Sequence, residues 1–291
     1  MDYFSFSSYR LAPENKYPIP IDDCWVVTKH ILNNPNEFNI DIDRICLAGD
    51  SAGGAAVAVI TQRLVKEGGR LPKLQILIYP WMQQFDFTLP SYEYQKSRKL
   101  VSFTGCSLVK LVLWYLGETD ASNEMENAVS SNEHVLLIKD KEMRKMYADC
   151  LDVDLIPEIY KTGKSYYNNV NKFKNSQLIT SELSSGSIFN KNKSFANSVK
   201  NLFNEDVSPG LVSDDLLKKL PKAYVVVCEN DELKDENIIY AERLRKNGVE
   251  VKIAFYEDGF HGLIVSVNKD TMNRIALEMV EDLIKYIKEN I

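Results

Sequence analysis

The sequence lacks the features that mark membrane-spanning, exported and nucleic-acid-binding proteins. No apolar run approaches the roughly 18 residues that a transmembrane helix needs, so no membrane span is expected. The first residues, Met1-Asp2-Tyr3-Phe4, have neither a basic segment nor a long apolar one, and so do not form a secretory signal. Acidic side chains outnumber basic ones by 41 to 35, and the net charge of −6 argues against a nucleic-acid partner.

Cysteine and histidine are also scarce. The five cysteines are odd in number and widely spaced, so they match neither a disulfide framework nor a zinc pattern, and we expect no metal or other cofactor. The three histidines, His30, His134 and His261, are the only candidates for an imidazole base. The remaining composition, 45% hydrophobic and 26% charged over 291 residues, is ordinary for a globular protein of one or two domains.

Strand and helix patterns alternate along both ends of the chain. Short apolar runs predict strands at 3–9, 45–48, 74–80, 223–228 and 251–256. Helical spacing and end signals predict helices at 22–32, from 51 to the glycines at 68–69, at 235–246 and over 272–287. This alternation predicts an α/β fold in which helices cover both faces of a mostly parallel sheet.

Residues 82–204 interrupt the alternation, and we interpret them as a cap that lies over the sheet within a single domain, 1–291. An amphipathic helix is predicted at 107–116. Residues 160–200 are rich in Asn, Lys and Ser, which predicts long surface loops or a linker with little fixed structure. The aromatic residues of the cap suggest an apolar pocket, although most such residues simply belong to a core: Phe85, Phe87, Phe103, Trp114 and Tyr115.

The stretch Gly49-Asp50-Ser51-Ala52-Gly53 follows an apolar strand and precedes a helix-forming run. A Gly-x-Ser-x-Gly pattern in this context places its serine on a strained strand-to-helix turn, with the hydroxyl above the sheet. We expect both glycines to be required because a Cβ at either position would meet neighbouring backbone. The N–H of Ala52, at the start of the helix, would face the place where an oxyanion forms.

Three reactive side chains follow predicted strands. In a parallel α/β sheet, functional groups gather at the carboxyl ends of the strands, where the chain has Ser51, Asp231 and His261. Ser51 would be the nucleophile, His261 its base, and Asp231 the carboxylate that fixes the imidazole tautomer. The same order of Ser, Asp and His along the chain is typical of α/β-hydrolases.

Other residues compete for two of these roles. His30 lies in a predicted helix and is expected at the surface or half-buried, and His134 is expected in a loop of the cap. Asp231 is favoured as the carboxylate because it follows its strand directly, whereas Asp235 is expected to cap the next helix. The acids that compete with Asp231 are Glu229, Glu232 and Asp235.

Together these motifs resemble the hormone-sensitive-lipase branch of the α/β-hydrolases, and most closely the arylacetamide deacetylase group. The resemblance covers nearly the whole chain in the family's order. It rests on Tyr9-Arg10-Leu11-Ala12-Pro13-Glu14, Gly49-Asp50-Ser51-Ala52-Gly53-Gly54, Leu77-Ile78-Tyr79-Pro80, Leu89-Pro90-Ser91-Tyr92, Asp231-Glu232-Leu233-Lys234-Asp235-Glu236 and Asp258-Gly259-Phe260-His261-Gly262.

The resemblance implies serine hydrolysis of small carboxylic esters and of acetylated arylamines or lipids. It also implies residence in the endoplasmic reticulum through an N-terminal anchor. Members carry His-Gly-Gly-Gly ahead of the Tyr-Arg-Leu-Ala-Pro stretch, and this sequence has no such motif, so we expect it to lack the family's first third. Those glycines supply oxyanion-hole donors, and losing one donor costs roughly 10²–10³ in rate, so Ala52 would act alone and activity would be reduced.

The absent motif also bears on stability. In the family its strand lies between those at 3–9 and 45–48, so here the strand at 3–9 either pairs with 45–48 or leaves backbone groups unpaired. We therefore expect a marginally stable or poorly soluble chain. The resemblance pairs Cys228 with a cysteine near the absent motif, which implies a free thiol at Cys228.

These observations favour a serine hydrolase that acts on a small-molecule ester or amide. The alternative is a catalytically inactive family member that binds apolar ligands or partner chains. A serine peptidase is a third hypothesis, although nothing in the sequence suggests a peptide-anchoring site. Neither the oligomeric state nor the acyl preference follows from the sequence.

Overall fold

The computed structural model describes residues 8–97, 107–161, 166, 176–266 and 274–291. Its strands are β1 (Cys46–Asp50), β2 (Leu74–Ile78), β3 (Lys222–Asn230) and β4 (Val251–Phe260). Its helices are α1 (Ile19–Asn33), α2 (Ala52–Lys66), α3 (Pro90–Ser97), α4 (Leu108–Tyr115), α5 (Asn123–Ser130), α6 (Lys141–Cys150), α8 (Ile188–Lys191), α9 (Lys193–Val199), α10 (Asp214–Leu217), α11 (Lys234–Lys246) and α12 (Arg274–Asn290).

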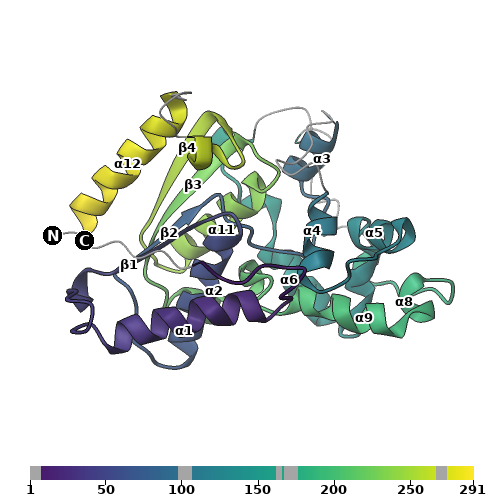
Figure 1. Cartoon of the computed structure of the whole chain (residues 1–291). Helices are drawn as coiled ribbons and strands as arrows, with labels where there is room; N and C mark the ends of the chain where they lie inside the picture. The colour runs from purple at the N-terminus through teal and green to yellow at the C-terminus, as the bar shows by residue number, and fades with distance from the viewer. Residues whose placement is uncertain (1–7, 98–106, 162–165, 167–175, 267–273) are drawn as a thin grey trace.

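The described strands form one parallel sheet in the order β1-β2-β3-β4, which confirms the predicted α/β class (Figure 1). The predicted strand at 3–9 falls mostly outside the described residues, and Ser8 and Tyr9 are not in a strand. Its pairing with the chain at 45–48 stays a prediction. Strand β4 runs to Phe260, beyond the predicted end at residue 256.

Helices cover both faces of this sheet, as the alternation predicts. Side chains alternate along β3, so that Tyr224 and Val226 face one core while Val225 faces the other. The first core contains Ala276 and Met279 of α12, and the second contains residues of α2 and α11. The central strands β2 and β3 are therefore buried on both sides, as expected for parallel strands, whereas no residue of β1 is buried and Ala48 is exposed.

Between β2 and β3 the described residues of 82–204, here called the middle segment, contain helices and no strand. Helices α3, α4, α5, α8 and α9 lie on the right of Figure 1. The prediction of surface loops or an unstructured linker at 160–200 is wrong for 188–199, which form α8 and α9 and bury Phe189 and Phe195 completely.

The aromatic residues predicted to line a pocket fall into three groups. Phe85 and Phe87 are buried in core clusters, and Trp114 and Tyr115 are partly buried. Phe103 lies outside the described residues. The core interpretation therefore holds for the first two side chains.

A buried carboxyl ties the start of the middle segment to α11. Glu236 is 1% exposed, and its Oε1 accepts the backbone N–H of Met82 at 2.6 Å. Its Oε2 accepts Gln83 Nε2 and the Tyr92 hydroxyl, each at 2.9 Å. Burial raises the pKa of Glu236 to about 8, although the hydrogen bonds from Met82, Gln83 and Tyr92 oppose the shift.

This pKa predicts that stability falls as pH rises. The unfolded chain loses the Glu236 proton near pH 4.5 while the folded chain keeps it until about pH 8, so unfolding releases a proton between those values. The free energy of unfolding should then drop by up to roughly 1.4 kcal/mol per pH unit through this group. Urea denaturation of Glu236→Gln across that range should give a flatter pH dependence, whereas exposed Glu142→Gln should follow the parent. Parallel curves for the parent and Glu236→Gln would contradict the assignment.

Candidate active site

Ser51 occupies a sharp turn between β1 and α2. Its φ of 54° and ψ of −118° lie outside the regions that L residues ordinarily adopt. Two backbone hydrogen bonds hold the turn against the end of β2. The Ser51 N–H donates to Ile78 O at 2.9 Å, and the Trp81 N–H donates to Ser51 O at 3.2 Å. The structure thus has the strand-turn-helix corner that the Gly-x-Ser-x-Gly pattern predicts.

Only one of the two glycines in that pattern is sterically required. A Cβ on Gly49 would lie 2.2 Å from Gly53 O, so no side chain fits there. A Cβ on Gly53 would meet nothing within 4 Å, so the predicted steric role of Gly53 is wrong. The second close approach is at Gly54, whose Cβ would lie 2.8 Å from Pro80 Cβ, because α2 starts directly against the chain that leaves β2.

The two glycines therefore make a matched pair of variants. Gly49→Ala should destabilise the protein by about 3 kcal/mol, since rigid backbone must shift to admit the methyl group. Gly53→Ala, within α2, should be neutral or stabilising by up to about 1 kcal/mol because alanine loses less backbone entropy. Chemical denaturation measures both effects. Equal stability of the two variants would contradict the close packing at Gly49.

The structure brings Ser51, His261 and Asp231 together, although 210 residues separate the first two in sequence. Ser51 Oγ lies 2.9 Å from His261 Nε2, and His261 Nδ1 lies 2.9 Å from Asp231 Oδ2. The other carboxylate oxygen of Asp231 accepts the Leu233 N–H at 2.8 Å. The three side chains thus form one continuous chain of hydrogen bonds from a hydroxyl to a carboxylate.

Burial and charge act in opposite directions on the imidazole. The His261 side chain is 18% exposed and Asp231 is fully buried. Burial lowers the pKa of His261, but the charge of Asp231 and its hydrogen bond outweigh burial and leave that pKa above its ordinary value. The negative charges of Glu232 and Asp50 act in the same direction as Asp231. The ring is therefore a stronger base than a free histidine.

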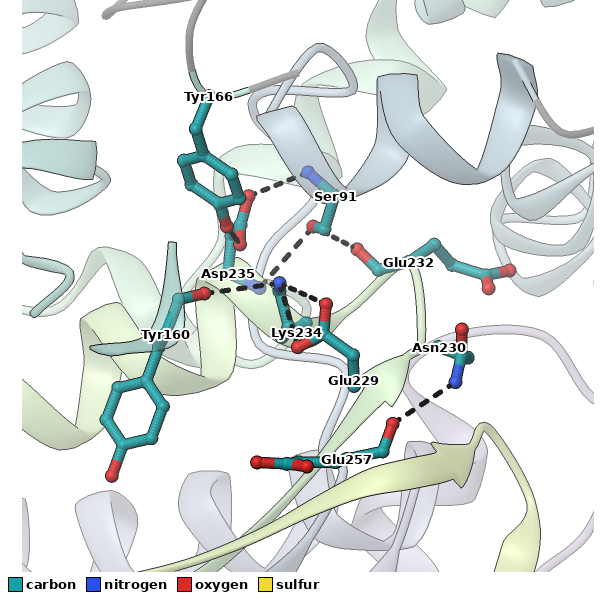
Figure 2. A network of polar contacts seen from close by, with 9 residues as sticks. All are labelled: Ser91, Tyr160, Tyr166, Glu229, Asn230, Glu232, Lys234, Asp235 and Glu257. Carbon is teal, nitrogen blue, oxygen red and sulfur yellow. Dashed lines mark hydrogen bonds and ion pairs between the residues drawn. The ribbon is translucent and has the colours of Figure 1, made fainter. Parts of the chain in front are cut away.

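Residues of the middle segment fasten the loop that carries Asp231 (Figure 2). Asp235 is fully buried in the first turn of α11, where it accepts the Ser91 N–H at 2.7 Å and the Tyr166 hydroxyl. Ser91 Oγ donates to the backbone oxygen of Glu232 at 2.6 Å. The prediction that Asp235 caps the next helix is wrong, because its carboxylate binds a different part of the chain.

Lys234 makes a second connection of the same kind (Figure 2). Its side chain is 3% exposed, and its ammonium lies 3.2 Å from Glu229 Oε1 and 3.3 Å from Tyr160 O. The burial of a paired cation shows that this loop is enclosed on the side of the middle segment. Glu229, which competes with Asp231 for the carboxylate role, is thus engaged by Lys234.

The two other histidines lie elsewhere. His30 is exposed and sits 3.3 Å from Glu37. His134 is fully buried in a 3₁₀ turn, so its prediction as a loop residue is wrong. Its Nε2 lies 3.1 Å from Gln84 O, and burial lowers its pKa to about 4, so it stays neutral near pH 7.

Two further predicted residues lie beside the site. Ala52 is exposed and opens α2, where the first backbone N–H groups of a helix have no partner within the helix. Cys228 is a buried free thiol on β3, as the resemblance implies. A Cβ on Gly259 would lie 2.8 Å from its sulfur, so this glycine lets β4 pass close to Cys228 on the way to His261.

In the described part of the chain, no helix combines the length and apolar character that crossing a membrane requires. Nor do His, Cys, Asp and Glu side chains of that part gather in threes or more where they could hold a metal ion.

The parallel sheet, the Gly-x-Ser-x-Gly turn at the end of β1, and the imidazole and carboxylate on later loops are the arrangement typical of α/β-hydrolases. The chain belongs to the α/β-hydrolase family, whose model matches residues 5–149 and 158–265. Human arylacetamide deacetylase-like 3 is 28% identical over 96% of this chain, and bovine arylacetamide deacetylase is 29% identical over 98%. The chain spans 63% and 64% of the lengths of these two relatives.

A solved structure has the same fold. Carboxyl esterase 2 of the fungus Tuber melanosporum superimposes with a TM-score of 0.60 at 18% identity, over 98% of this chain and 65% of that one. At that identity the likeness concerns the fold alone.

Proposed function

We propose that this chain is a serine hydrolase of small carboxylic esters or acetylated arylamines, with Ser51, His261 and Asp231 as its catalytic residues. The observation that carries the proposal is the hydrogen-bond chain from Ser51 Oγ through His261 to Asp231, with both distances at 2.9 Å. A serine hydroxyl near neutral pH is a weak nucleophile, and an aligned base is what activates it. The names of the curated relatives, arylacetamide deacetylase and its like, support an acyl-group substrate.

The proposed reaction has two stages. Ser51 Oγ attacks the acyl carbonyl while His261 Nε2 takes its proton, and the protonated imidazole then gives this proton to the departing alcohol or amine. Water, deprotonated by the same nitrogen, next attacks the acyl-serine, and the imidazolium returns that proton to Ser51 Oγ as the acid leaves. Asp231 accepts the Nδ1–H throughout and stabilises the imidazolium, and the Ala52 N–H donates to the oxyanion.

The middle segment is proposed to act as a cap over this site. Its support is the set of contacts that Ser91, Tyr160 and Tyr166 make with the loop around Asp231. A cap of this kind would exclude water and contact the acyl or leaving group. Residence in the endoplasmic reticulum stays a prediction from the resemblance.

Turnover of three substrates tests the proposal: p-nitrophenyl butyrate, p-nitroacetanilide and a peptide mixture. We expect the ester to be cleaved fastest, the arylacetamide more slowly and the peptides not at all. Ester turnover no greater than that of Ser51→Ala protein would reject the hydrolase and favour a catalytically inactive chain. Cleavage of the peptides alone would favour a peptidase.

A further inference from the structure

Tyr79, directly after β2, has an unusual backbone. Its φ is 34°, a left-handed conformation that costs free energy for a bulky aromatic residue. The side chain is fully buried, and its N–H donates to Val226 O of β3 at 3.0 Å. Residues held in such conformations persist only where their surroundings fix them, and they cluster at functional sites.

The residues on either side of Tyr79 hold the Ser51 turn. Ile78 O accepts the Ser51 N–H at 2.9 Å, and the Trp81 N–H donates to Ser51 O at 3.2 Å. Pro80 packs against α2 at Gly54. The corner at residues 78–81 therefore fixes the backbone of the proposed nucleophile from both directions.

The side chain of Tyr79 reaches the loop of the proposed base. Its ring centroid lies 5.0 Å from that of His261, with the two rings tilted by 58°. Its hydroxyl oxygen accepts the N–H of Ile264 at 3.3 Å. Ile264 belongs to the 3₁₀ turn η8 (Leu263–Ser266), which begins two residues after His261. One side chain thus contacts both the imidazole and the backbone that follows it.

We propose that Tyr79 is a positioning residue that holds the His261 imidazole in place relative to the Ser51 hydroxyl. Its backbone is part of the corner that holds Ser51, and its side chain holds the His261 loop, so the two halves of the hydrogen-bonded pair share one support. The two residues that this link joins are 210 positions apart in the sequence. This inference rests on the proposed function.

Tyr79 does not itself transfer the proton in this scheme. Burial, followed by the negative charge of Asp50, raises the pKa of its phenol far above the ordinary value. The hydroxyl therefore stays protonated at any pH at which the protein works. Tyr79 instead supplies a ring that contacts the His261 imidazole and a hydroxyl oxygen that accepts the Ile264 N–H.

Two variants separate these contributions. Tyr79→Phe keeps the ring and loses the acceptor for Ile264, so kcat for p-nitrophenyl butyrate should fall roughly 2- to 10-fold. Tyr79→Leu also loses the ring contact, and kcat should fall about 10²-fold, because small misplacements of a catalytic group are costly. KM should change little in both, since neither contact is proposed to touch substrate.

Tyr240 on α11 provides matched controls. It is also buried, at 2% exposed, and its hydroxyl accepts Gln62 Nε2 at 3.4 Å. Tyr240→Phe and Tyr240→Leu therefore remove a comparable hydroxyl and ring. The end point of fluorophosphonate labelling counts the reactive sites in each preparation, and rates are divided by that number. A loss of rate caused by unfolded protein is then distinguished from one caused by misplaced catalytic groups.

A readout without turnover completes the test. The proton of His261 Nδ1 that is hydrogen-bonded to Asp231 should give a strongly downfield NMR resonance in the parent and in the Tyr240 variants. The resonance should broaden or vanish in Tyr79→Leu, because the loop that carries His261 is held less firmly. If Tyr79→Leu does not fold, Tyr79→Phe is compared with Tyr240→Phe instead. Per-site rates and a resonance equal to those of the Tyr240 controls would overturn the role of Tyr79. Absent turnover in the parent would reject the proposed function, and the resonance would still decide this inference.

Discussion

Replacing Ser51 with alanine is expected to lower kcat for p-nitrophenyl butyrate by at least about 10⁴-fold, with little change in KM. The hydroxyl that His261 Nε2 approaches to 2.9 Å is the only proposed nucleophile, so no acyl-serine can form without it. Steady-state kinetics on purified protein measure the effect. Binding of substrate to the rest of the site should survive, because the change removes a single oxygen atom.

The control for this variant is Ser213→Ala, which removes an exposed hydroxyl that makes no capping hydrogen bond at the start of α10. It should retain the parent's kcat. A Ser51→Ala protein that hydrolyses the ester as fast as the Ser213→Ala protein would place the nucleophile elsewhere.

Asp231→Asn is expected to lower kcat by about 10⁴-fold while leaving the fold intact. The asparagine amide can donate to His261 Nδ1, which would force the proton onto Nε2 and prevent that nitrogen from accepting the proton of Ser51. Kinetics with p-nitrophenyl butyrate measure the loss. Asp215→Asn, an exposed carboxylate paired with Lys218, should have no effect.

The same variant should shift the pH dependence of the residual activity. His261 acts as a base only when neutral, so kcat/KM in the parent should rise with pH through a pKa above the ordinary 6.5. Removing the charge of Asp231 leaves burial as the main influence, which lowers the pKa and moves the rise to lower pH. An unchanged pH profile in Asp231→Asn would mean that Asp231 does not act on His261.

Much of the fold could be predicted because its strands and helices carry local signals. The apolar runs at 74–80 and 223–228 lie where β2 and β3 form, and the helix predicted at 235–246 corresponds to α11. The three proposed catalytic residues could be identified because each lies a few residues after a predicted strand and they occur in the order Ser, Asp, His. The helices at 188–199 cannot be predicted in this way, because they are short, lie in a polar sequence and bury their phenylalanines only through tertiary packing.

The supports of the site could not be predicted, since they depend on long-range contacts. Nothing local distinguishes Ser91 or Tyr79 from other residues of their stretches, although both lie within motifs that carry the resemblance. Their partners are 144 and 185 residues away in sequence. The position of Asp235 alone predicts a helix cap, whereas its carboxylate binds Ser91. The spacing of Gly49 and Gly53 likewise could not show that only Gly49 faces the backbone.

Mass-spectrometric mapping of a fluorophosphonate adduct tests the proposed triad most directly, because the probe reports an activated serine whatever the true substrate is. The expected result is a single adduct on Ser51 in the parent chain and none in His261→Ala protein within the same time. An adduct on another serine, or equal labelling of Ser51 with and without His261, would contradict the proposed mechanism.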